Sequence, residues 1–201
     1  MKRAVFLDRD GVLNEVILRD GQPHSPIHLA EFRIVFGAKD ALTALRRAGY
    51  LLIVATNQPD VARQIQSQCI VEIMHERLMA HLPLDDIQVC YHDDHHQCDC
   101  RKPRPGLLLR AAQQWGISLS ESYMIGDRSK DLEAGRRAGC KTVLLRYPYN
   151  ESHAVAADYR AASLLEATAW ILGSRPQQEA PLRRSAAAAL SLGAAYRLGR
   201  M

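Results

Sequence analysis

The sequence lacks any apolar run long enough to cross a membrane. Its longest apolar runs, such as residues 51–55, have the length of a single strand, whereas a transmembrane helix needs about 20 apolar residues. Only residues 4–7 separate the initial Met-Lys-Arg from the charged residues that follow, which is too short for the apolar part of a signal peptide. We therefore expect a cytoplasmic protein that binds no membrane.

Net charge is also lacking over most of the chain. Residues 175–201 contain five arginines and one glutamate, so they account for the whole formal charge of +4, and the first 174 residues are neutral overall. A neutral body gives no reason to expect nucleic-acid binding, which depends on many phosphate contacts. No charge or hydrophobic pattern indicates a stable protein partner either, and we expect a monomer.

The sequence has no internal repeat, and its composition changes only near the end. Residues 1–173 predict one domain of ordinary size. Residues 174–201 are rich in alanine and arginine and predict a flexible or loosely helical tail. We interpret this tail as a solvated extension. An interaction arm is the alternative, and its basic residues would be Arg183, Arg184, Arg197 and Arg200.

Short apolar segments alternate with amphipathic ones along residues 1–173. Segments rich in Val, Ile, Leu and aromatic residues predict buried strands at residues 4–7, 51–55, 87–91, 123–125 and 142–145. Helical patterns occur at residues 38–48, 69–81, 106–115 and 130–138, and residues 157–172 predict a last short strand or turn followed by a helix. Glycines stand where three of the helices should end, at Gly49, Gly116 and Gly139. This alternation predicts an α/β fold with a mostly parallel sheet covered by helices on both faces.

Polar residues follow four of these strands at the carboxyl end, where ligands bind in parallel sheets. They include Asp8 and Asp10, Thr56, Lys102, and Asp127 with its neighbour Asp131. Asp8 and Asp10 are two residues apart and can face one pocket in extended backbone. Converging carboxylates repel one another unless a cation such as Mg²⁺ holds them, and Thr56 and Lys102 could donate to phosphate oxygens. The pattern therefore predicts a site for phosphoryl transfer.

Each of these features has an ordinary structural explanation when it is taken singly. An Asp-x-Asp pair is usually a solvated turn, Thr-Asn after a strand is common turn chemistry, and Lys102 could be a surface charge. Their shared position at the ends of four strands favours the functional interpretation.

Asp-x-Asp-Gly-Val at residues 8–12 is followed by Thr56, by Lys102 and by Gly-Asp-x-x-x-Asp at residues 126–131. In this series the chain resembles the haloacid dehalogenase-like (HAD) superfamily over about residues 3–172. The resemblance implies a Rossmann-like three-layer fold and a phosphatase that forms a phosphoaspartyl intermediate.

The same resemblance implies a role for each residue. Asp8 would be the nucleophile, and Asp10 would protonate the leaving oxygen and then activate water. Thr56 and Lys102 would hold the phosphoryl group. Mg²⁺ would bind the Asp8 carboxylate, the Asp10 backbone carbonyl and Asp127. Asp131 would orient this metal shell or Lys102.

Residues 90–100 contain four candidate metal ligands in Cys-x-His-x5-Cys-x-Cys spacing, at Cys90, His92, Cys98 and Cys100. The odd total of five cysteines, three of them beside histidines, favours a metal over disulfides. Three cysteines and a histidine form a closed shell that is typical of structural Zn²⁺. His95 or His96 could replace His92, and incidental surface cysteines are the other alternative. We expect the zinc to position Arg101 and Lys102, which follow the last ligand directly.

The Cys/His segment together with Arg-Lys-Pro-x-Pro-Gly at residues 101–106 narrows the resemblance. With these two segments the chain resembles the branch of the superfamily that contains heptose 1,7-bisphosphate 7-phosphatases and histidinol-phosphate phosphatases. A small phosphorylated metabolite is then the expected substrate, with heptose 1,7-bisphosphate or a related sugar phosphate favoured and histidinol phosphate as the alternative. Residues 14–26 would border the substrate in place of a large cap domain. The expected substrate-binding residues are Asn14, Asn57, Gln58, Arg101 and Arg128.

The chain departs from the family pattern just after Gln58. Pro59 and Asp60 replace a small Ser-Gly pair beside the phosphate pocket, and Gln64 replaces a glycine. These changes bear on which substrate we expect. They do not alter the reaction that we expect, because the catalytic residues are present.

Two other classes of function compete with the enzyme. Loss of Asp8 or Asp10 would have supported a non-catalytic module that binds a phosphorylated ligand or a partner, and both residues are present. Nucleic-acid binding through the Cys/His segment and the tail is disfavoured, because the tail offers only Tyr196 for stacking and the segment is acidic at Asp93, Asp94 and Asp99.

Overall fold

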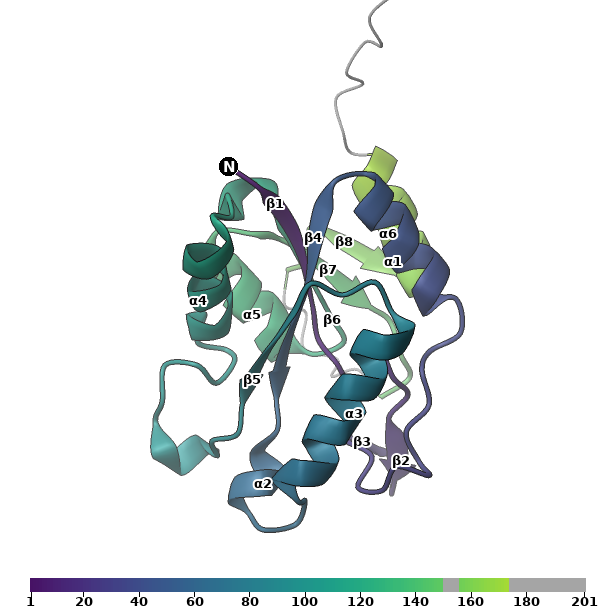
Figure 1. Ribbon diagram of the computed structural model, residues 1–201, viewed down its shortest axis with the longest axis vertical. Helices are drawn as coiled ribbons and strands as arrows, with labels where there is room; N and C mark the ends of the chain where they lie inside the picture. Colours follow the sequence, from purple (N-terminus) through teal and green to yellow (C-terminus); the bar gives the residue numbers. More distant parts are fainter. Residues whose placement is uncertain (150–155, 174–201) are drawn as a thin grey trace, which may run out of the picture.

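Six parallel strands form the central sheet of the computed structural model, which describes residues 1–149 and 156–173. The strand order is β5-β4-β1-β6-β7-β8 (Figure 1). The strands are β1 Arg3–Leu7, β4 Tyr50–Asn57, β5 Asp86–Cys90, β6 Tyr123–Gly126, β7 Lys141–Leu145 and β8 Tyr159–Ala161. All five strands predicted from the apolar segments are present, and β8 is the expected last short strand. The predicted tail, residues 174–201, lies outside the described residues.

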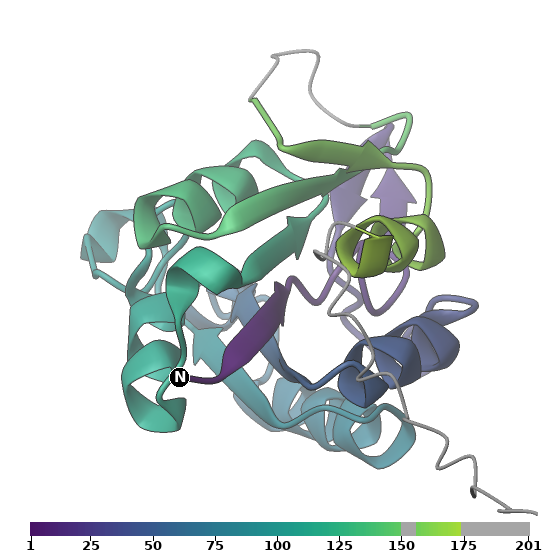
Figure 2. The same ribbon diagram turned by 90° about the horizontal axis from the view of Figure 1, so that it is seen from above.

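Helices cover both faces of this sheet because successive strand residues point to opposite sides. Val5 and Leu7 belong to one apolar core, whereas Ala4 and Phe6 belong to the other. The first core also takes residues from α1 Ala38–Arg47, α3 Gln68–His81 and α6 Leu164–Gly173. The second lies against α4 Gly106–Trp115, and α5 Ser129–Ala138 packs on the same face (Figure 2). The predicted three-layer α/β fold is confirmed.

The helices α1, α4 and α5 end at the positions predicted from the glycines. Gly116 and Gly139 are the C-terminal caps of α4 and α5, with φ angles of 67° and 87°. Gly49 follows the cap residue of α1 with a φ of 84°. Residues with a side chain rarely adopt this left-handed conformation. Among the described residues, no helix is long and apolar enough to cross a membrane.

The order of the strands creates a switch point between β1 and β6. These two strands are neighbours in the sheet. From β1 the chain continues to β4 on one side of the pair, whereas from β6 it continues to β7 on the other side. The loops that leave β1 and β6 therefore diverge and open a crevice at the carboxyl end of the sheet. Asp8 and Asp127 are the first residues after these two strands.

Two short elements near this crevice were not expected from the sequence. The hairpin of β2 Ile17–Arg19 and β3 Gln22–His24 lies within residues 14–26, and α2 Pro59–Ala62 follows β4. Each has only three or four residues, too few to show a periodic pattern, and a proline such as Pro23 is uncommon inside strands. Figure 1 shows the hairpin and α2 at the same end of the sheet as the loop that follows β5. This loop contains the 3-10 helix η1 Asp94–His96, and a second one, η2 Leu119–Glu121, precedes β6.

Candidate active site

Lys102 joins two carboxylates at the carboxyl end of the sheet. Its Nζ lies 2.9 Å from Asp8 Oδ1 and 2.6 Å from Asp131 Oδ1. Asp8 follows β1, Asp131 is in the first turn of α5, and Lys102 precedes α4. Burial alone would lower the pKa of Lys102, but the charges of Asp131 and Asp8 raise it above its ordinary value. The ammonium group therefore stays charged.

The second group of carboxylates consists of Asp8, Asp127 and Asp131, whose ligand oxygens all lie within 4.8 Å of one another. Burial and the charge of Asp131 raise the pKa of Asp8 to about 6 and that of Asp127 to about 8. A cation among these oxygens would stabilise their charged forms and lower both pKa values. A Cβ atom at Gly11, where φ is 83°, would lie 2.5 Å from Asp127 Oδ2, so only glycine allows this approach. Buried oxygen ligands of this kind fit Mg²⁺.

No sequence pattern indicated Tyr149, which also contacts this group. Its hydroxyl donates a hydrogen bond of 3.1 Å to Asp127 Oδ2, and its ring stacks on Tyr147 with ring centroids 5.0 Å apart. Tyr149 follows β7 and is 22 residues from Asp127, so only the packing of the two loops brings them together.

Asp10 is held by a dense set of donors. Arg9 donates to both of its oxygens through Nη2 at 3.0 Å and to Oδ1 through Nε at 3.1 Å. Asn14 Nδ2 lies 2.8 Å from Oδ1, and Gln58 Nε2 and Ser25 Oγ each lie 2.9 Å from Oδ2. Burial alone would raise the pKa of Asp10, but the Arg9 charge and these hydrogen bonds lower it. The carboxylate is therefore ionised and fixed in one orientation.

Arg9 is fully buried, although in the sequence it appears as an ordinary charged residue between two aspartates. Its Nη1 lies 3.3 Å from His75 Nε2 on α3, and its Nη2 donates to Gln58 Oε1 at 3.1 Å. Burial and the Arg9 charge lower the pKa of His75 to about 4, so its ring is neutral and accepts from Arg9. Contacts across 66 and 49 residues leave no local sequence signal.

Residues at the end of β4 hold Gln58 and Lys102, which contact Asp10 and Asp8. Thr56 is 1% exposed and accepts from Gln58 Nε2 at 2.9 Å. The Asn57 side chain donates to the Lys102 carbonyl at 3.0 Å and accepts from the Lys102 backbone N–H at 3.1 Å. This reciprocal pair fixes the backbone that carries the Lys102 ammonium beside Asp8.

A pocket of about 290 Å³ opens above Asp8 and Asp10. Among the predicted substrate-binding residues, Asn57, Arg101 and Arg128 line it. Asn14 and Gln58 are buried and bond Asp10 instead, so they act on the pocket through that carboxylate. The hairpin side contributes Pro23, His24 and Ser25, and the opposite side contributes Pro59, Asp60 and Arg63, with Lys130 completing the lining.

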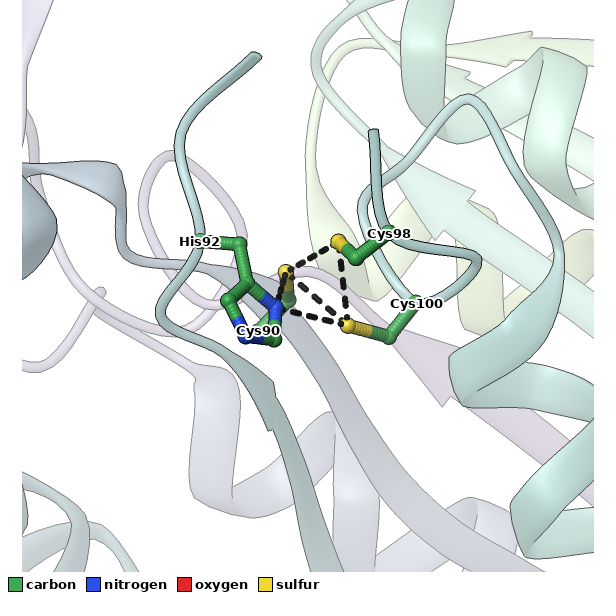
Figure 3. A group of neighbouring side chains, drawn as sticks. All are labelled: Cys90, His92, Cys98 and Cys100. Carbon is green, nitrogen blue, oxygen red and sulfur yellow. Dashed lines mark hydrogen bonds between the residues drawn. The ribbon is translucent and has the colours of Figure 1, made fainter. Parts of the chain in front are cut away.

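The predicted metal ligands of the loop after β5 also come together (Figure 3). Cys100 Sγ lies 3.2 Å from Cys90 Sγ, 3.3 Å from Cys98 Sγ and 3.3 Å from His92 Nδ1. All five cysteines are free of disulfides. His95 and His96 are exposed, and His96 accepts from the Asp93 backbone N–H rather than joining the cluster. Three sulfurs and one imidazole nitrogen at these separations fit a tetrahedral Zn²⁺ site.

The comparisons with known proteins agree with this geometry. A profile of the HAD-hydrolase-like family matches residues 99–167. The D-glycero-beta-D-manno-heptose-1,7-bisphosphate 7-phosphatase of Pasteurella multocida is 36% identical over 187 residues, which is 86% of this chain and 98% of that protein. The chain belongs to this family of HAD-like phosphatases.

Further relatives of this HAD-like phosphatase include the protein of the same name from Escherichia coli K12, 36% identical over 155 residues, which cover 71% of this chain and 78% of that protein. Among solved structures, the D,D-heptose 1,7-bisphosphate phosphatase of B. bronchiseptica, complexed with magnesium and phosphate, is similar with a TM-score of 0.75 and 26% identity. That match covers 87% of this chain and the whole of the other. The enzyme is therefore a phosphoric monoester hydrolase, as the resemblance to the HAD superfamily implied.

Proposed function

We propose that this HAD-like phosphatase removes a phosphate from heptose 1,7-bisphosphate or a related sugar phosphate through a phosphoaspartyl intermediate on Asp8. The observation that carries the proposal is the position of Asp8 at the bottom of the pocket. Its carboxylate lies 2.9 Å from Lys102 Nζ and close to Asp127, and the pocket above it is lined by cationic residues. The names of the relatives support the choice of substrate.

The chemistry divides between the two aspartates after β1. The Asp8 carboxylate attacks phosphorus, and the bond from phosphorus to the sugar oxygen breaks while Asp10 donates a proton to that oxygen. Because Asp10 is ionised in the free protein, it must take up this proton before the step, when the substrate binds. Asp10 then takes a proton from water, whose oxygen attacks the phosphoaspartyl group and releases phosphate and the free Asp8 carboxylate. Arg9, Asn14, Gln58 and Ser25 keep Asp10 in place for both steps.

The remaining residues bind and neutralise the phosphoryl group. Lys102 and Thr56 would hold its oxygens, and Asp131 orients Lys102 through their contact of 2.6 Å. The Asp8 and Asp127 carboxylates and the Asp10 backbone carbonyl would hold Mg²⁺, which supplies positive charge to the phosphoryl oxygens. Arg101 and Arg128 would recognise the rest of the substrate, with Asn57 holding the Lys102 backbone.

Cys90, His92, Cys98 and Cys100 would hold a structural Zn²⁺. A full shell of protein ligands leaves no open position for substrate, so this metal would order the loop rather than react. The loop lies between β5 and Arg101, which lines the pocket.

Phosphate release from a panel of esters tests the proposal. The panel contains heptose 1,7-bisphosphate, histidinol phosphate and hexose bisphosphates, each with Mg²⁺, and Asp8→Asn is the matched inactive variant. We expect the heptose ester to be hydrolysed fastest and Asp8→Asn to abolish release. Faster hydrolysis of histidinol phosphate would keep the mechanism and replace the substrate. Release of phosphate by Asp8→Asn at the wild-type rate would contradict the assignment of Asp8 as the nucleophile.

A further inference from the structure

Two arginines that line the pocket are held by consecutive aspartates of the zinc loop, defined here as residues 90–100. Arg63 forms a bidentate pair with Asp93, since its Nε and Nη2 each lie 2.7 Å from one of the Asp93 oxygens. Arg101 pairs with Asp94 through Nε at 2.5 Å and Nη2 at 3.2 Å. Arg63 is the residue after α2, and Arg101 follows the last candidate zinc ligand. The loop therefore anchors arginines from two separate segments of the chain.

Asp93 is the more central of the two aspartates. Its side chain is 15% exposed, whereas that of Asp94 is 79% exposed. Asp93 Oδ1 lies 2.7 Å from Arg63 Nη2 and 3.9 Å from Arg101 Nη2, so one oxygen faces both guanidinium groups. The same oxygen accepts from the Asp94 backbone N–H at 2.7 Å.

Both arginines keep N–H groups that are available to a ligand. A guanidinium group carries five N–H bonds. Arg63 uses three of them, two toward Asp93 and one toward Asp60 at 3.3 Å. Arg101 also uses three, two toward Asp94 and one toward the His92 carbonyl at 3.3 Å. Because Arg63 and Arg101 line the pocket that contains Asp8, their remaining N–H groups can bind an anionic part of the substrate.

We propose that Asp93 is a positioning residue, which holds Arg63 and Arg101 at the pocket so that they bind the second phosphate of a sugar bisphosphate, the one that is not transferred. This rests on the proposed function, because it requires a substrate with two phosphates. A guanidinium that is already held by a carboxylate loses less side-chain freedom when it binds a phosphate. Asp93 thus acts on substrate affinity and leaves the reaction at Asp8 unchanged.

Steady-state kinetics of Asp93→Asn on two substrates test this role. The first substrate is heptose 1,7-bisphosphate. The second is heptose 7-phosphate, which keeps the 7-phosphate that the named relatives remove and lacks the phosphate at position 1. We expect KM for the bisphosphate to rise at least tenfold with kcat within twofold of wild type, and KM for the monophosphate to stay within twofold. Asp99→Asn is the matched control, since it makes the same charge change in the same loop and its side chain is fully exposed. It should change neither KM, and both variants should retain the zinc content of the wild type.

A double-mutant cycle with Arg63→Gln shows whether Asp93 acts through that arginine. We expect the rise in KM of the double variant to be smaller than the product of the two single rises, because both changes act on the Arg63 contact and only the hold of Asp93 on Arg101 is independent of it. Four outcomes would overturn the proposal. The rises in KM of the two single variants could multiply in the double variant, or Asp93→Asn could raise KM equally for both substrates. Asp93→Asn could also lower kcat at constant KM, or lose its zinc.

Calorimetry separates this proposal from the proposed reaction. Heptose 1,7-bisphosphate is titrated into Asp8→Asn and into the Asp8→Asn, Asp93→Asn double variant, neither of which can form the phosphoaspartyl intermediate. Binding that weakens at least tenfold in the double variant supports the role of Asp93 whatever ester the enzyme hydrolyses. Equal affinity in the two proteins, or no binding in either, overturns it. The proposed reaction itself fails if the wild type releases no phosphate or if Asp8→Asn releases it at the wild-type rate.

Discussion

Lys102 Nζ lies 2.6 Å from Asp131 Oδ1, and neither side chain is exposed to solvent. The same ammonium group lies 2.9 Å from Asp8 Oδ1, so Lys102 bridges the proposed nucleophile and a carboxylate from α5. Removing one partner of a buried ion pair leaves the other without compensation. The stability of the domain and the position of the ammonium group that we propose binds phosphate therefore depend on the same contact.

The change Asp131→Ala tests this dependence. We expect the free energy of unfolding to fall by about 3–5 kcal/mol, because Lys102 keeps only Asp8 as a partner, and kcat to fall about 100-fold or more through loss of a positioned donor. Urea unfolding and phosphate release measure the two effects. Glu133→Gln on the same helix is the control, since Glu133 makes only exposed contacts with Arg136 and Arg137 and should change neither quantity appreciably. Wild-type stability in Asp131→Ala would contradict the buried pair.

The raised carboxyl pKa values predict how stability depends on pH without magnesium. The folded-state pKa values of Asp8, about 6, and Asp127, about 8, lie above the ordinary value of 3.8. Folded protein then keeps protons that the unfolded chain has released, so the free energy of unfolding falls as pH rises from about 4 and levels off above about 8. Asp10, whose pKa is lowered, acts in the opposite direction below its ordinary value of 3.8. His75, whose pKa is lowered from 6.5 to about 4, also acts in the opposite direction between these values, but the two aspartates together outweigh it up to about pH 6, and Asp127 alone continues the fall above 6.5.

Magnesium should oppose this loss, because it binds the deprotonated carboxylates. We expect Mg²⁺ to raise Tm more at pH 8 than at pH 5, as measured by thermal unfolding in metal-free buffer with and without added Mg²⁺. Strong chelators are avoided, since they would also remove zinc. Asp127→Asn is the control and should lose most of the magnesium effect. A magnesium shift that is equal at both pH values would contradict the assignment of these carboxylates as ligands.

Removal of zinc should expose thiols and lower Tm. With the metal bound, we expect a thiol reagent to react quickly only with Cys69, which is exposed and outside the cluster. After treatment with a zinc chelator under reducing conditions, Cys90, Cys98 and Cys100 should also react, whereas Cys140 stays protected by burial. A metal-sensitive dye should report one zinc released per chain. Cys98→Ser should abolish this release, Cys69→Ser should not, and rapid reaction of all cluster thiols before chelation would contradict the site.

Gln64 lies in the left-handed region with a φ of 59°, at the position where the family usually has glycine. Gln64→Gly should therefore raise the free energy of unfolding by about 1 kcal/mol, because glycine adopts this conformation without steric cost. Gln113→Gly in the interior of α4 is the matched control and should lower it by about 0.5–1 kcal/mol. Urea unfolding measures both, and a destabilised Gln64→Gly would show that the side chain contributes more than the strain removes.

The sequence by itself determined the strands of the central sheet, the long helices that cover it and the positions where polar residues leave the sheet. Apolar periodicity records which side of a strand or helix is buried, and glycines mark helix ends, so these features can be predicted from neighbouring residues. The ends of parallel strands must meet at one edge, which is why Asp8, Lys102, Asp127 and Asp131 could be expected to converge before their distances were known. The spacing of Cys90, His92, Cys98 and Cys100 is equally local.

Only the tertiary structure decided which partners these residues have. Arg9 is buried against Gln58 and His75, which are 49 and 66 residues away, as well as against its neighbour Asp10. Asp93 holds Arg63 across 30 residues. Tyr149 reaches Asp127 in the same way. Such contacts depend on how loops pack once the sheet has formed, and a charged or aromatic residue in a loop looks the same in the sequence whether it is solvated or buried. The class of reaction was thus visible in the sequence, whereas the orientation of Asp10 and of the pocket arginines came from packing alone.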